Sequence, residues 1–73
     1  MDKMDVLILD GCTHREAEKH LKNGTRVFDS IAEYIECMEA DGQSVPEDIE
    51  ANIKAGKLAD VHYIDGHVIE YVL

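Results

Sequence analysis

The C-terminal part of the chain carries the pattern that most restricts its fold. Residues 61–64 and 67–72 are two runs rich in Val, Ile and Tyr, and the pair Asp65-Gly66 lies between them. An Asp-Gly pair at this place is the strongest short signal for a β-hairpin with a two-residue type I′ turn. Because a single hairpin is barely stable in water, the rest of the chain has to supply further strands or a covering layer of helices.

Two upstream segments are candidates for those strands. Residues 25–28 form a short β-favouring run and are the expected third strand. Residues 5–9 include the longest uninterrupted apolar run of the chain. We expect this second segment to form either a further strand or a lead-in that packs against the first helix.

The first two helices are predicted from their N-terminal signals. Thr13 followed by Glu16 is a capping box, which opens a helix. Asp29 or Ser30 caps a second helix over residues 30–41. Apolar side chains recur along this helix at helical spacing, which predicts a face packed on the core: Ile31, Tyr34, Ile35 and Met38.

A third helix is expected over residues 45–55. Ser44 and Glu47 repeat the capping-box pattern, and Pro46 falls in the first turn, where its missing N–H carries no cost. These elements predict an α+β fold with residues 1–73 as a single domain. We expect a small two-layer domain of about three helices on a short, mostly antiparallel sheet that ends in the C-terminal β-hairpin.

Both faces of the predicted hairpin are substantially apolar. One face carries His62 and His67 together with Ile64, Ile69 and Tyr71. The other face carries Val61, Tyr63, Val68 and Val72. Either the chain covers the sheet on both sides, or one face meets a second subunit, so a homodimer stays an open alternative.

Composition fits a folded domain and argues against nucleic-acid and membrane partners. Apolar residues make up 45% of the chain, which is ordinary for a globular protein. The net charge of −9 opposes binding to nucleic acids or anionic lipids. No apolar run approaches the roughly 18 residues of a membrane span, and no secretory signal follows Met1. We therefore expect a cytoplasmic protein in which Cys12 and Cys37 are reduced.

The negative charge is concentrated in one stretch. Between Val27 and Ile53 the chain has eight acidic residues and no Lys or Arg, whereas residues 1–26 hold five of each sign. Acidic side chains on a helix usually form a solvated surface. A helix built only for solubility would, however, place Lys among them, because carboxylates three residues apart repel each other and disfavour the helix. The absence of Lys in this stretch therefore indicates a binding role. We expect a basic protein surface as the partner, and the candidate partner-binding residues are Asp29, Glu33, Glu36, Glu39, Glu47, Asp48 and Glu50.

Other uses of the charged residues stay open. Rows of carboxylates can stand in for nucleic-acid phosphates, so a nucleic-acid-mimicking inhibitor is one alternative. The ligand spacing of a calcium loop is absent. On the first helix Arg15, Lys19 and Lys22 share a face. They form either a surface ladder with neighbouring Glu residues or a contact for an acidic partner, including the acidic stretch of a second copy.

A metal- or thiol-dependent site around Cys12 and His14 is the remaining alternative. Cys12 lies just before a helix N-terminus, which favours a thiolate, and His14 is two residues away. The spacing lacks the paired ligands of zinc sites, and His14 and His20 point to different sides of the helix. No third group is evident that would orient a catalytic pair. The sequence therefore predicts a non-enzymatic protein without catalytic residues, metal ligands or a cofactor.

One segment resembles other proteins. The stretch D-G-C-T-H-R-E-A-E-K-H-L-K-N-G-T at residues 10–25, continuing into residues 27–29, is similar to a segment of short uncharacterised bacterial proteins, often from phage-like or other mobile elements. The resemblance covers about the first half of the chain and assigns no role to any residue. It implies a small intracellular protein directed at a host component. With the charge pattern, it favours a small acidic protein-interaction module that binds through the second and third helices.

Overall fold

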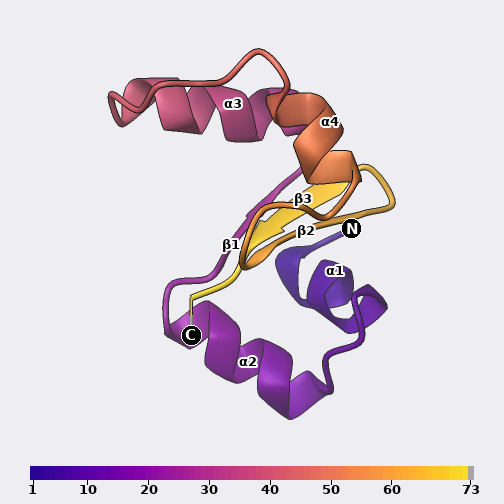
Figure 1. Cartoon of the computed structure of the whole chain (residues 1–73). Coiled ribbons are helices and arrows are strands. Elements are labelled where there is room, and N and C mark those ends of the chain that lie inside the picture. The colour runs from indigo at the N-terminus through magenta and orange to yellow at the C-terminus, as the bar shows by residue number, and fades with distance from the viewer. Residues whose placement is uncertain (73) are drawn as a thin grey trace.

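Helices and a small sheet make up the fold, as shown by a computed structural model that describes residues 1–72 (Figure 1). The α+β class, the antiparallel sheet and the C-terminal hairpin predicted from the sequence are confirmed. In chain order the elements are α1 (Lys3–Leu9), α2 (His14–Lys22), β1 (Arg26–Phe28), α3 (Ile31–Ala40), α4 (Ile49–Lys54), β2 (Val61–Ile64) and β3 (His67–Glu70).

The sheet has the strand order β1-β3-β2, so that β3 is its central strand. Both strand pairs are antiparallel, and Tyr63 and Val27 pair with Val68 and Ile69 respectively. The turn between β2 and β3 has positive φ at both central residues, 48° at Asp65 and 83° at Gly66. A type I′ turn requires positive φ at both positions, which is why the Asp-Gly pair forms this hairpin.

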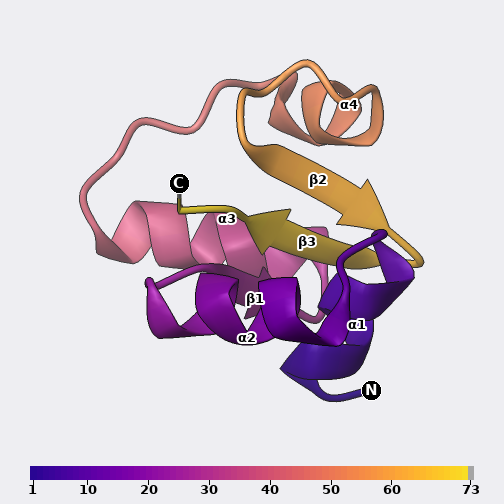
Figure 2. The same ribbon diagram turned by 90° about the horizontal axis from the view of Figure 1, so that it is seen from below.

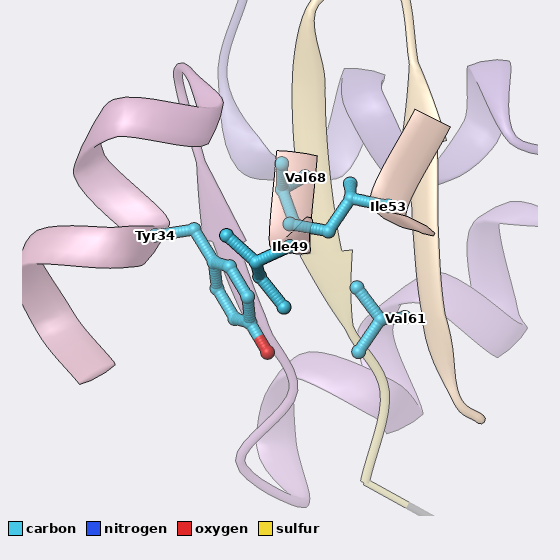
Figure 3. Packing of buried hydrophobic residues seen from close by; sticks show 5 residues of the cluster. All are labelled: Tyr34, Ile49, Ile53, Val61 and Val68. Carbon is cyan, nitrogen blue, oxygen red and sulfur yellow. The ribbon is translucent and has the colours of Figure 1, made fainter. Parts of the chain in front are cut away.

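The two faces of the sheet are covered by different helices. Val68 and Ile69 are adjacent on β3 and both fully buried, and adjacent residues of a strand point to opposite faces. Val68 packs with buried residues of α3, α4 and β2, namely Tyr34, Ile49, Ile53 and Val61 (Figure 3). Ile69 packs with Val6, Leu7 and Ala17 of α1 and α2.

Four helices therefore lie in two layers within the described chain, α3 and α4 on one side of the sheet and α1 and α2 on the other (Figures 1 and 2). A single helical layer does not form, because both faces of β3 carry large apolar side chains. The alternative in which the chain covers the sheet on both sides is the one observed. Within residues 1–72, no helix is long and apolar enough to cross a membrane.

Residues 5–9 belong to a helix, so the strand alternative for this segment is wrong. Asp2 is the N-cap of α1, and its side chain accepts a hydrogen bond from the Asp5 N–H at 2.9 Å. Val6 and Leu7 are buried against Ala17, so the segment packs against α2, as the lead-in alternative predicted. A short apolar run does not distinguish a strand from a helix, and here the cap and the packing decide.

The start of the third predicted helix is also wrong. α4 begins at Ile49 rather than at residue 45, and its N-cap, Asp48, makes no side-chain capping bond. Val45 packs on the α3–α4 core cluster from an irregular segment outside any helix. The chain is irregular over residues 43–46 and turns at residues 47 and 48, so the capping-box pattern of Ser44 and Glu47 does not start a helix.

The other two predicted caps are present. Thr13 and Glu16 form both halves of the capping box of α2, with hydrogen bonds of 3.1 and 2.9 Å. Ser30, and not Asp29, is the N-cap of α3, because its hydroxyl accepts from the Glu33 N–H at 3.1 Å. Glu33 in turn accepts from the Asp29 N–H, so one carboxylate of the acidic stretch stabilises the start of its own helix.

Candidate functional site

All eight acidic side chains between residues 29 and 50 are exposed. They lie on α3, in the segments at its two ends and on α4, on one side of the sheet (Figure 1). This side also carries cations: Lys54 and Lys57 lie in and just after α4, and the Arg26 guanidinium lies against the C-terminal half of α3. The helical scaffold therefore brings together the residues that the sequence singled out as partner-binding.

Half of these carboxylates have partners inside the molecule. Glu33 caps α3, as described above. Asp41 Oδ2 lies 3.8 Å from Arg26 Nη1, and Glu50 Oε1 lies 3.2 Å from Lys54 Nζ. Asp29 Oδ1 lies 3.7 Å from His67 Nδ1, which is too long for a hydrogen bond. The exposed pairs with Arg26 and Lys54 contribute only about 0–1 kcal/mol each to stability, so they weaken the local negative field without removing it.

The other half remain unneutralised in the part of the chain that the structure describes. Glu36 and Glu39 on α3, and Glu47 and Asp48 just before α4, form no ion pair there. These four residues are named the free carboxylates below.

The basic stripe of α2 lies on the far side of the sheet from α3 (Figure 1). Arg15, Lys19 and Lys22 are exposed, and within residues 1–72 they form no ion pair with Glu16 or Glu18. These cations therefore cannot neutralise the free carboxylates of the same molecule.

A second candidate site is a pocket of about 290 Å³. It opens between the α1–α2 loop, the exposed side of α2, the loop before β2, and Tyr71, which follows β3. Cys12, a candidate thiol, is in its lining together with His20, whereas His14 is exposed and outside it. The structure therefore separates Cys12 from the histidine that the sequence paired with it.

Tyr71 is at the centre of the polar network in this pocket. Its hydroxyl donates to Asp10 Oδ2 at 2.6 Å, and His62 Nδ1 lies 2.7 Å from the same oxygen. Because the acceptor is a carboxylate oxygen, Nδ1 carries the hydrogen of a neutral His62 ring. Cys12 Sγ lies 3.6 Å from the Tyr71 hydroxyl oxygen. Since the Tyr71 hydrogen is directed to Asp10, the Cys12 thiol is the donor in this last contact.

The surroundings of Tyr71 keep its phenol neutral. Burial raises the pKa of Tyr71 well above its ordinary value, and the hydrogen bond that its hydroxyl donates to Asp10 raises it further. The rings of His20 and His62 pack against the Tyr71 ring edge-to-face, with centroid distances of 4.9 and 4.8 Å. These contacts hold the aromatic wall of the pocket in place.

This geometry does not activate Cys12. A nucleophilic thiol needs an adjacent base, but the Cys12 thiol donates to a neutral phenol and is not hydrogen-bonded to an imidazole of the described chain. Within residues 1–72, no group of three or more His, Cys, Asp or Glu side chains is arranged to hold a metal ion. The chemistry that the pocket offers is recognition by hydrogen bonding, and the thiol takes part as a donor.

Sequence reasoning found only part of this pocket. It placed His62 and Tyr71 on one face of the hairpin, but it did not bring Asp10 to them. Asp10 is 52 and 61 positions from these two residues along the chain. No local pattern signals a contact over such a separation, because it depends on how α1 and α2 pack on the sheet.

Comparisons with models of protein families, with curated proteins and with solved structures gave no match. The function therefore has to be inferred from the chain's own residues and their arrangement.

Proposed function

We propose that this protein is a small, non-enzymatic interaction module that binds a basic surface of another protein through α3 and the segment that leads into α4. The observation that carries this proposal is the separation of charge across the sheet. The free carboxylates lie on one side and the basic stripe of α2 on the other (Figure 1). The resemblance to proteins of mobile elements that we expect for residues 10–25 would make the partner a host protein.

A one-sided negative field orients an approaching basic protein and speeds its encounter. Single exposed ion pairs contribute only about 0–1 kcal/mol, so the carboxylates provide steering and orientation more than affinity. The net charge of −9 works against association of two copies through their acidic sides. The expected partner is therefore a different protein with an excess of Lys and Arg.

The proposal is tested by capturing partners from a lysate of the host at about 0.1 M and 1 M salt, where the Debye length falls from about 10 to 3 Å. A partner that binds the acidic side is recovered at low salt and lost at high salt. The variant E36Q/E39Q neutralises two free carboxylates and removes a like-charge pair from α3, so its fold is expected to be retained. It should recover less of the same partner.

D5N/E18Q is the matched control, because it removes two exposed negative charges from α1 and α2 on the other side of the sheet. Equal recovery by E36Q/E39Q and the wild type, or an equal loss in both double variants, rejects a site on α3. A captured partner that short double-stranded DNA displaces from the wild type identifies the nucleic-acid-mimicking alternative.

A further inference from the structure

The pocket beside Tyr71 has a chemistry that the proposed acidic surface does not explain. Its lining residues come from the α1–α2 loop, α2, β2 and the chain next to the sheet, and none of them belongs to α3. Three carboxylates line it, those of Asp10, Glu16 and Asp60, and no Lys or Arg is in its lining. The Asp10 side chain is only 13% exposed, whereas that of His62 is 54% exposed.

The hydrogen-bond donors of the network are already used inside it. Tyr71 and His62 donate to Asp10, and the Cys12 thiol donates to Tyr71. Both bonds to Asp10 end on Oδ2, so Oδ1 receives neither of them. Carboxylate oxygens only accept hydrogen bonds. A ligand that binds to these carboxylates therefore has to bring donors, and a positive charge favours it over a neutral donor.

From this balance of donors and acceptors, we infer that the pocket binds a small organic cation, an ammonium or guanidinium group. An ammonium group offers three donors and a guanidinium group five. The Tyr71 ring adds an aromatic surface, which attracts cations. The cation is either the head group of a free amine or the end of a Lys or Arg side chain from another protein.

The test is a titration of ¹⁵N-labelled protein by NMR with butylammonium, ethylguanidinium and a short Lys-containing peptide. The amide signals of Gly11, Cys12 and Asp60 are expected to shift in a saturable way. The same peptide with an acetylated Lys side chain is the neutral probe and should bind at least about fivefold more weakly. Tighter binding of the Lys peptide than of butylammonium indicates a protein side chain as the ligand, and the reverse order indicates a free amine.

The variant E16Q/D60N removes two carboxylates without disturbing the backbone that carries them. Gln is accepted in a capping box, and Asn tolerates the left-handed conformation of Asp60, whose φ is 60°. Its affinity for butylammonium is expected to fall about fivefold. E18Q/D65N is the matched control, because Glu18 is on the same helix outside the pocket and Asp65 is also left-handed, with φ of 48°.

Three results overturn the inference. One is an equal fall of affinity in E16Q/D60N and E18Q/D65N, which indicates general attraction to a negative protein. Another is equal binding of the acetylated peptide. The third is a set of shifts that falls on α3 and not on the pocket. The first two results leave partner capture through Glu36 and Glu39 unaffected, and the third overturns the pocket while favouring α3, so the two proposals fail separately.

Discussion

The Tyr71 hydroxyl donates a hydrogen bond of 2.6 Å to Asp10 Oδ2, although the two residues are 61 positions apart. Asp10 is the C-cap of α1, and Tyr71 directly follows β3. The bond therefore ties the α1–α2 pair to the sheet. The apolar core on this side is small, with Val6, Leu7, Ala17 and Ile69 as its buried members, so the polar network is expected to matter for docking these helices.

The first prediction is that Y71F destabilises the protein by about 1–3 kcal/mol, because it leaves Asp10 without its closest donor and Cys12 without an acceptor. Urea unfolding measures the change. Y63F is the control, since Tyr63 is exposed and its loss of a hydroxyl should cost less than about 0.5 kcal/mol. Equal unfolding midpoints for the two variants would show that the network does not stabilise the fold.

A second prediction concerns alkaline pH. Burial raises the pKa of Tyr71, and burial together with the nearby Glu70 carboxylate raises that of Tyr34. Above the ordinary tyrosine pKa of about 10, the unfolded chain loses these protons and the folded chain keeps them. The associated stability is therefore complete below pH of about 10 and is lost as pH rises above it.

Urea unfolding at a series of pH values from about 9 to 11 measures this loss, and absorbance at 295 nm follows tyrosinate formation. Y71F should show a smaller decline over the same range, because it lacks one of the two phenols. A decline of the same size in Y71F and the wild type would assign the effect to other groups.

The third prediction compares the N-terminal cap of α2 at Thr13, which forms, with the predicted cap at Ser44, which does not. T13A removes the acceptor for the Glu16 N–H and is expected to cost about 1 kcal/mol. S44A should change stability by less than about 0.5 kcal/mol, because α4 starts at Ile49 and not next to Ser44. Thermal or urea unfolding compares the two variants. A loss in S44A as large as that in T13A would contradict the position of α4.

The fourth prediction tests whether the two layers fold as one unit. I69V and I53V each remove one methylene from a fully buried side chain, on opposite faces of the sheet, and should each cost about 0.5–1.5 kcal/mol. I8V is the control, because Ile8 is exposed. The double variant I53V/I69V should unfold in a single transition with additive losses. Two separate transitions in the double variant would indicate that the layers unfold independently.

The sequence by itself determined the elements that short-range interactions specify. The Asp65-Gly66 turn formed because only a few residues accept positive φ at both positions of a type I′ turn. The starts of α2 and α3 followed from hydroxyl side chains that cap N–H groups three residues away. In each case the signal and the structure that it specifies lie within a few residues of each other.

Only the tertiary structure decided the conformation of residues 3–9, the start of α4, the placement of the helices and the pocket, because these features depend on contacts between residues far apart in the chain. Residues 3–9 became a helix once Val6 and Leu7 could be buried against α2 and the sheet. The capping pattern at Ser44 did not start a helix, and Val45 packs on the core from an irregular segment. The pocket around Tyr71 depends on contacts across more than 50 positions, and the division of the helices between two faces depends on their packing against β3, so no local pattern encodes either.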